Sequence, residues 1–363
     1  MRPDPEEKRE GASAPSRIIE RPRAEGFGPG AYLAFLAVML AAMVLCVCAG
    51  SVSIPVRDTV RVIAAAVLGR ETPGIKASSI ILSVRLPRVL CVALTGAALA
   101  LSGAAMQGLL KNPLADGSTL GVSSGASLGA VIAIAFGLSF PSLPFAGTML
   151  LAVAFAFGSL LLILALAWRL DRSLSTHTII LIGVIFSMLV NSVLTLILTF
   201  ASDRVKNITF WTMGSLAGSS YANALVLAAA LALCGGVLLR LSRELNAFAV
   251  GEDNARHIGV PVRRVRLAVL IAVSALTGVC VSIGGSLAFV GLVTPHILRM
   301  LTGPNHRRLL PASCFGGAVF LLLCDLCARV LLNPLQLPIG VVTSLIGAVI
   351  FLVIFYRNGR GAP

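Results

Sequence analysis

Apolar runs of about twenty residues recur along this chain from Ala31 to Tyr356, and no long polar block separates them. A helix of this length spans the hydrocarbon core of a bilayer. The sequence is 57% hydrophobic and 12% charged, whereas about a quarter of the residues in a soluble domain are charged. These features exclude a soluble globule and predict an all-α, polytopic membrane protein.

The length of the apolar runs predicts about ten transmembrane helices that form one membrane domain over residues 31–356. Between two of them, the pair Gly284 and Gly285 requires a turn within the membrane or at its edge, which is tolerated where protein buries it. A polar tail, 1–30, is expected to be disordered, and a short tail, 357–363, follows the domain. The predicted spans are 31–50, 86–110, 118–138, 144–168, 177–200, 222–240, 265–284, 286–301, 309–331 and 337–356.

The 29 Lys and Arg residues are distributed unevenly between the two sides of the membrane. An even number of crossings places both termini on one side, which then holds twenty of the basic residues, against nine on the other side. Because basic residues are enriched in cytoplasmic loops, both termini are expected in the cytoplasm. This bias and anionic lipid account for the positive charge of the chain, so no nucleic-acid partner is expected.

The largest inner loop contains the segment LNAFAVGEDNARHIGV, residues 245–260, in which apolar and charged residues alternate. Gly251 is expected to divide it into two short helices, Gly259 suits a helix C-terminus, and Pro261 prevents continuation. A pair of short amphipathic helices on the cytoplasmic face is typical of a docking element. The alternative is an ordinary hairpin that lies on lipid headgroups.

Arginines on the outer side have no acidic neighbour in sequence that would account for all of them. Arg85 and Arg88 begin a helix, and Arg329 lies near the outer end of another. Such a group suggests an acidic partner surface, because arginine offers paired donors to carboxylates. The alternative is snorkelling to lipid phosphate. Asp325 precedes Arg329 by four residues, which favours an ion pair on one helix face.

Two further patterns bear on packing and on energy supply. Gly121, Gly125 and Gly129 are spaced four apart and allow helix backbones to approach closely in lipid. No G-x-x-x-x-G-K-[ST] sequence occurs, so a transport process driven by ATP would need a separate ATPase polypeptide.

Several blocks of the sequence together resemble a known family. They are RLPRVL, TGAALALSGAAMQGLLKNPLADGSTLGVSSGASLGA, GEDNARHIGV, GGSLAFVGLVTPHILRMLTGPNHRRLLP and LPIGVVTSLIGAVIF. In this order they are similar to the iron-siderophore, haem and vitamin B12 ABC importer permeases, over about residues 54–356. The resemblance implies the type II ABC importer permease fold of about ten transmembrane helices in the bacterial cytoplasmic membrane.

The resemblance also implies partners and residue roles. The chain would pair with a second permease subunit, expected to be identical, two ATPase subunits that hold ATP and Mg²⁺, and one periplasmic or lipid-anchored binding protein. It would itself bind no cofactor or metal and have no catalytic residue. The implied roles are ATPase coupling for Gly251, Glu252, Asp253, Ala255, Arg256, Ile258 and Gly259, docking of the binding protein for Arg85, Arg88 and Arg329, and translocation path or helix packing for Gln107, Asn112, Pro113, Gly121, Gly125, Pro295 and His296.

The sequence departs from the family pattern at three positions. Gly117 stands in place of a common proline, Gln336 in place of an acidic residue, and Ala348 in place of a second proline.

The expected cargo is a ferric siderophore, with haem and cobamide as alternatives. An ion-coupled secondary transporter would need inverted repeats and acids at the membrane midplane, and a polytopic membrane enzyme would need a cluster of His, Asp or Glu. Neither pattern is evident.

Overall fold

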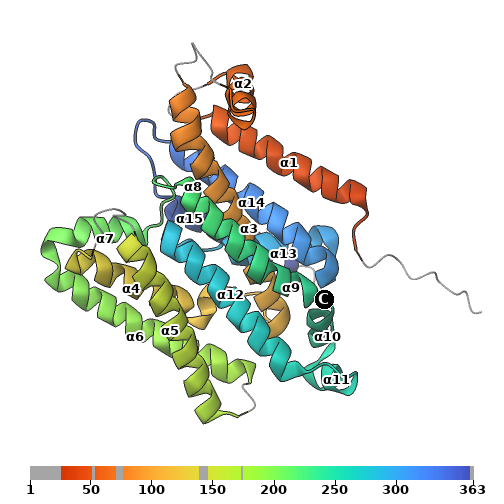
Figure 1. Cartoon of the computed structure of the whole chain (residues 1–363). Coiled ribbons are helices and arrows are strands. Elements are labelled where there is room, and N and C mark those ends of the chain that lie inside the picture. Colours follow the sequence, from red (N-terminus) through yellow and green to blue (C-terminus); the bar gives the residue numbers. More distant parts are fainter. Residues whose placement is uncertain (1–25, 51–53, 71–76, 139–145, 173–174, 360–363) are drawn as a thin grey trace, which may run out of the picture.

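The computed structural model describes residues 26–50, 54–70, 77–138, 146–172 and 175–359, and all the regular elements in these ranges are helical (Figure 1). Most of the tail predicted to be disordered, 1–25, and the end of the C-terminal tail lie outside the described residues. The last helix, α15 (Ile339–Gly359), runs a few residues beyond the predicted end of the membrane domain.

Seven helices of the described residues are long and apolar enough to cross a membrane, and two further apolar helices are shorter. All nine coincide with predicted spans. The long ones are α1 (Pro29–Cys48), α3 (Leu86–Leu110) with the π-helical segment that precedes it (Ile80–Arg85), α5 (Ala146–Leu170), α6 (Thr176–Phe200), α8 (Tyr221–Ala230) continued by α9 (Gly236–Arg240), α12 (Val262–Gly284) and α14 (His306–Val330). The shorter ones are α4 (Val122–Phe136) and the apolar part of α15, Ile339–Ile354.

The central helix of the bundle is α3. In its most apolar stretch of 18 residues, 89% of the residues are buried within the protein, compared with 22% in the corresponding stretch of α6. Glycines bring neighbouring backbones against it. A Cβ at Gly96 would overlap the backbone of Gly317 on α14, and one at Gly103 would overlap the carbonyl of Gly291 on α13 (Val290–Thr302). In lipid, where apolar burial drives helix association little, such close contact is a main source of attraction.

The stripe of small residues on α4 allows close helix packing, and the structure shows that its partner is α5. A side chain at Gly125 would overlap Ser159, and one at Gly129 would overlap the carbonyl of Leu151. Gly121 has φ 75° at the start of α4, a left-handed conformation that glycine adopts without strain. The stripe therefore joins α4 to α5, and α4, α5 and α6 lie together at one side of the bundle (Figure 1).

The chain turns between α12 and α13 where the glycine pair predicted it. Helix α12 ends at Gly284, Gly285 has φ 71°, and α13 begins at Val290 after Phe289 with φ 66°. Protein covers this bend, since Gly284 and Gly285 are buried and Ser215 N–H donates to the carbonyl of Gly284 at 2.8 Å. Helix α13, which corresponds to the predicted span 286–301, has 13 residues and is too short to cross a bilayer.

Two helices outside the long spans were not predicted. Helix α2 (Val56–Val67) follows α1, and α7 (Val205–Thr212) follows α6. Figure 1 shows α2 at one end of the bundle and α11 (Glu252–His257) at the opposite end, so the long helices run between these two short ones.

Candidate functional site

The loop between α9 and α12 forms the two short helices that its sequence predicts. Helix α10 (Ser242–Val250) ends at Gly251, whose φ of 143° suits glycine, and α11 begins at the next residue. Gly259 has φ 86° after α11, and Pro261 precedes α12. The two glycines thus set the angle at which α11 leaves the bundle.

Helix α11 is fixed to the first turns of α12 by an ion pair. Glu252 approaches the Arg266 guanidinium at 2.7 Å, and its other oxygen approaches Arg256 at 3.1 Å. The Arg266 side chain is 2% exposed, and a buried charge of this kind is costly without its partner. Asp253 lies 3.8 Å from Arg256 and is mostly exposed. Glu252 therefore has a positioning role, whereas Asp253 is available at the surface.

Apolar side chains project from this pair of helices into the surroundings. Val250, at the end of α10, is 73% exposed, and Ile258, just after α11, is 72% exposed, whereas Ala255 is fully buried beneath them. Two exposed aliphatic side chains beside the charged Asp253 and Arg256 form a small mixed surface.

A hydrogen-bonded joint connects α10 to the start of α14. Asn246 Oδ1 accepts from the backbone N–H of His306 at 2.8 Å and contacts His306 Nδ1 at 2.9 Å. Asn246 Nδ2 donates to Asn305 Oδ1 at 2.9 Å, and Asn305 caps α14. The His306 ring is buried against Gly108 of α3, where a Cβ would overlap it. The joint thus links the loop helices to two buried helices of the bundle.

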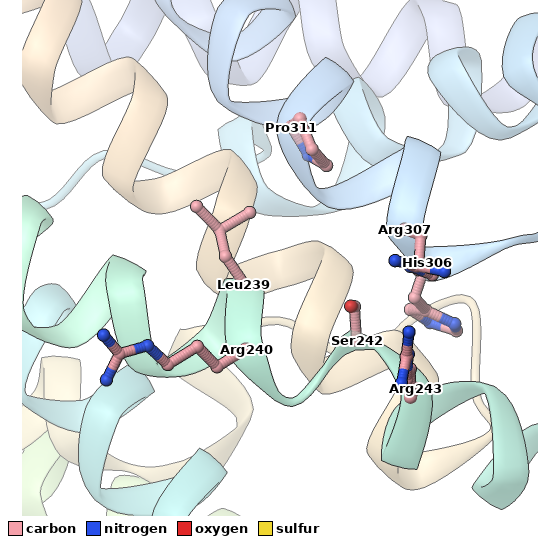
Figure 2. A pocket seen from close by; sticks show the side chains of 7 residues that line it. All are labelled: Leu239, Arg240, Ser242, Arg243, His306, Arg307 and Pro311. Carbon is pink, nitrogen blue, oxygen red and sulfur yellow. The ribbon is translucent and has the colours of Figure 1, made fainter. Parts of the chain in front are cut away.

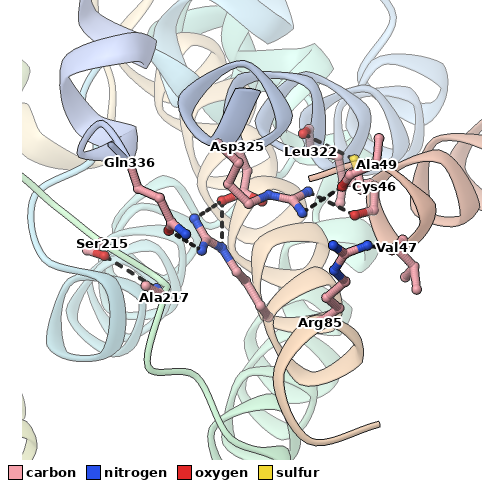
Figure 3. A network of polar contacts seen from close by, with 11 residues as sticks. Cys46, Val47, Ala49, Arg85, Ser215, Ala217, Leu322, Asp325 and Gln336 are labelled. Carbon is pink, nitrogen blue, oxygen red and sulfur yellow. Dashed lines mark hydrogen bonds and ion pairs between the residues drawn. The ribbon is translucent and has the colours of Figure 1, made fainter. Parts of the chain in front are cut away.

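At the other end of the bundle, Asp325 lies between two arginines (Figure 3). Its carboxylate is 2.8 Å from Arg88 and 2.9 Å from Arg329, so the predicted same-face pair with Arg329 is confirmed. Arg88 also donates to Gln336 Oε1 at 3.0 Å. Gln336 is exposed, so the Arg88 guanidinium lies one side chain below the surface.

Arg85 and Arg329 also bind the C-terminal turn of α1. Arg85 donates to the carbonyls of Val47 and Cys48 at 2.7 and 3.0 Å, and Arg329 donates to those of Cys46 and Ala49 at 2.9 and 3.0 Å. Cations are favourable at this end of a helix, because its last carbonyls lack partners.

The three arginines implied in docking are therefore not fully exposed at the outer surface. Arg85, Arg88 and Arg329 are 7%, 7% and 4% exposed, and each has partners within the protein. Sequence spacing could not reveal the pair of Arg88 with Asp325, because the two residues lie 237 positions apart. The implied docking role of these arginines is a separate matter and stays a prediction.

The residues implied in a translocation path or in packing are not gathered at one place. Gln107 is buried and ties α3 to α13, since it donates to the carbonyl of Leu292 at 3.2 Å and accepts from Arg299 at 3.1 Å. Asn112 accepts from the N–H of Leu114 at 2.9 Å in the turn after α3, where Pro113 is exposed.

The last two residues of this group lie within α13. Pro295 is buried in the helix, and the His296 ring lies edge-on to Phe351 of α15 at 6.2 Å between centroids. The contacts of Gln107, Gly121, Gly125 and His296 are those of packed helices.

Sequence analysis missed four positioning residues: Asn246, Arg266, Arg299 and His306. Asn246 lies within the recognised loop and Arg266 lies shortly after it, and a basic residue within an apolar span, such as Arg299, is a signal in itself. Their partners lie on other helices and could not be read from local spacing.

Comparisons with known proteins agree with this architecture. The sequence profile of the FecCD transport family matches residues 38–357. YvrB of Bacillus subtilis (strain 168), an uncharacterized ABC transporter permease protein, is 41% identical over 338 residues, 91% of this chain and 94% of that protein. BtuC of Salmonella typhi, a vitamin B12 import system permease protein, is 38% identical over 278 residues, 76% of this chain and 83% of that protein.

A solved structure gives the same result. It is an inward-facing ABC transporter of the metal-chelate type, which aligns with a TM-score of 0.80 at 33% identity and covers 91% of this chain and 100% of that chain. The helical bundle, the projecting pair of loop helices and this likeness define the membrane-spanning permease of an ABC importer. The chain belongs to the FecCD transport family. The predicted type II ABC permease fold is thereby confirmed.

Proposed function

We propose that this chain is the permease through which an ABC importer moves an iron chelate, a ferric siderophore first and haem or cobamide as alternatives, across the bacterial cytoplasmic membrane. The observation that carries the proposal is the projecting pair α10 and α11. It presents an exposed mixed surface and is anchored by Glu252 and Asn246 to buried parts of the bundle. A segment held in this way transmits a displacement rather than absorbing it.

In the proposed complex, two permease subunits, expected to be identical, bind two ATPase subunits, and both termini of each permease face the cytoplasm. ATP and Mg²⁺ are bound by the ATPases. The mixed surface at Val250, Asp253, Arg256 and Ile258 enters a cleft of an ATPase, and closure of the ATPase dimer shifts the helices between two packed arrangements. The permease performs no covalent chemistry.

On the opposite face, a binding protein delivers the cargo, and its acidic residues meet Arg85, Arg88 and Arg329. These three side chains and Asp325 together carry a net charge of plus two. A carboxylate of the binding protein would offset this charge, because arginine pairs well with carboxylates in a region of low dielectric constant. Docking would then exchange contacts within the chain for contacts with the partner.

The coupling surface can be tested with the permease, its ATPase and its binding protein reconstituted in lipid vesicles. Ile258→Glu places a charge in the apolar part of the proposed contact, and we expect loss of ATPase association and of uptake. Leu68→Glu, at an equally exposed position after α2, is the matched control and should leave both unchanged. Association of the ATPase with both variants alike would contradict the coupling role.

Docking and cargo need separate measurements. Arg85→Gln should reduce the stimulation of ATP hydrolysis by the binding protein about tenfold or more, since one charge-assisted contact contributes roughly 1.5–3 kcal/mol. Arg57→Gln, at an exposed site on α2, should not reduce this stimulation, and equal stimulation of both variants would refute the docking assignment.

Uptake of a labelled ferric siderophore, haem and cobamide, each with vanadate or an uncoupler, identifies the cargo and energy source. Uptake that resists vanadate would contradict ATP coupling.

A further inference from the structure

A basic hollow lies beside the joint between α10 and α14, outside the contacts assigned above. Its volume is 380 Å³, within the range of small-ligand pockets (Figure 2). Three arginines line it: Arg240 at the end of α9, Arg243 at the start of α10 and Arg307 at the start of α14. Arginine guanidinium groups match the geometry of phosphate oxygens.

Two further features of the hollow favour an anion. Ser242 contributes a hydroxyl to the lining. The wall is also the N-terminal end of the 25-residue helix α14, whose dipole adds positive potential. In Figure 2, Arg243 lies beside His306 and Arg307, whereas the Arg240 side chain extends away from Ser242.

The depth of the hollow relative to the membrane indicates which phosphate it meets. One apolar span ends at Arg240 and another begins at His306, and both residues line the hollow. The hollow therefore lies at the boundary of the hydrocarbon layer, on the side of α10 and α11. Lipid phosphates lie at this level, whereas dissolved anions are concentrated in the water beyond it.

An apolar path leads along α9 and the segment before it to the same place. Leu233 is 73% exposed and Val237 is 39% exposed. Val237 precedes Arg240 by three positions and shares its face of α9, and Leu233 lies in the π-helical segment just before α9. An acyl chain packed along this face would bring its headgroup to the guanidinium of Arg240. Free phosphate would gain nothing from this surface.

From the cavity, its charge, its depth and this path, we propose that the hollow binds the headgroup of an anionic phospholipid, with the phosphate between Arg240, Arg243 and the start of α14. Basic pockets between transmembrane helices on this side of the membrane suit such lipids. A zwitterionic headgroup is less favourable, because its ammonium group would face the arginines. The proposal does not depend on the cargo or on the docking of the binding protein.

The test uses the purified full chain in a non-ionic detergent and native mass spectrometry to count retained lipid. Phosphatidylglycerol should be retained on the wild type and phosphatidylcholine should not. In Arg240→Gln/Arg243→Gln, retention of phosphatidylglycerol should weaken roughly thirtyfold, from the loss of two basic residues near the headgroup. Arg57→Gln/Arg61→Gln, which removes the same charge from exposed positions on α2, should behave as the wild type.

Each other outcome overturns the proposal. Equal retention in the two double variants would mean that the hollow is not the binding site, or that charge anywhere on the protein suffices. If inorganic phosphate at the concentration of the lipid displaces phosphatidylglycerol, the hollow is a site for free anions. If Arg240→Gln/Arg243→Gln loses the ATPase and retains the lipid, the hollow belongs to a protein interface.

Discussion

The close contact between α3 and α13 predicts that a single methyl group at Gly103 destabilises the bundle. A Cβ there would overlap the carbonyl of Gly291, which belongs to the backbone and cannot rotate away. The helices must therefore separate over the length of the contact. Overpacking in a dense interior costs about 1–3 kcal/mol, and we expect the upper end of this range.

The matched control is Gly158→Ala, in the interior of α5. A Cβ at Gly158 would meet no atom within 4 Å, and replacement of glycine by alanine within a helix adds about 0.5–1 kcal/mol of stability. Because this gain applies equally to Gly103, which is also inside a helix, the two variants should differ in free energy of unfolding by the overpacking cost, about 3 kcal/mol, or roughly 150-fold in the folding equilibrium.

Unfolding can be followed by the fluorescence of the two tryptophans as the SDS fraction of mixed micelles is raised. We expect Gly103→Ala to unfold at a clearly lower SDS fraction than the wild type, and Gly158→Ala at the same or a higher fraction. Equal stability of the two variants would refute the argument, because it would mean that the backbones of α3 and α13 are not in contact.

Three further predictions concern the polar contacts. Asp325→Asn should reduce the free energy of unfolding by about 3–5 kcal/mol in the micelle assay, because it leaves two buried arginines without their carboxylate. Arg88→Gln keeps the ion pair with Arg329 and should reduce it by less. A larger loss for Arg88→Gln would contradict this account. Asn246→Ala removes the joint to α14 and should uncouple ATP hydrolysis from uptake. Asn254→Ala, at an exposed position, should preserve this coupling. Full coupling in both variants would show that the joint does not transmit movement between the ATPase and the bundle. Glu252→Gln should release α11 and speed its hydrogen exchange, and unchanged exchange would show that the ion pair does not hold this helix.

The helices were predictable to the extent that their signals are local. The predicted span 86–110 coincides with α3, and Gly251 divides the inner loop as expected. Both follow from hydropathy and from glycine geometry over a few neighbouring residues. The predicted span 118–138 was less accurate, because Gly121 delays the start of α4 to Val122.

Most of the ion pairs and hydrogen bonds that the buried arginines form could not be predicted from the sequence. Arg88 and Arg299 are neutralised or hydrogen-bonded by residues on helices far along the chain, Asp325 and Gln107. A single sequence records neither the order in which helices pack nor their rotation. It could therefore suggest that the arginines are important without giving their partners.

The glycine contacts of α3 have a mechanical consequence. Arg88 lies near one end of this helix and Gly108 near the other, about 30 Å apart at 1.5 Å per residue. Between these ends, Gly96 packs directly against the backbone of α14 and Gly103 against that of α13. No side chain that could change rotamer lies between the backbones. We therefore expect these three helices to move as one rigid body. In the proposed complex, a displacement of α11 by the ATPase would reach the opposite surface as a tilt of this body, and the pathway would open where less tightly packed helices adjoin it.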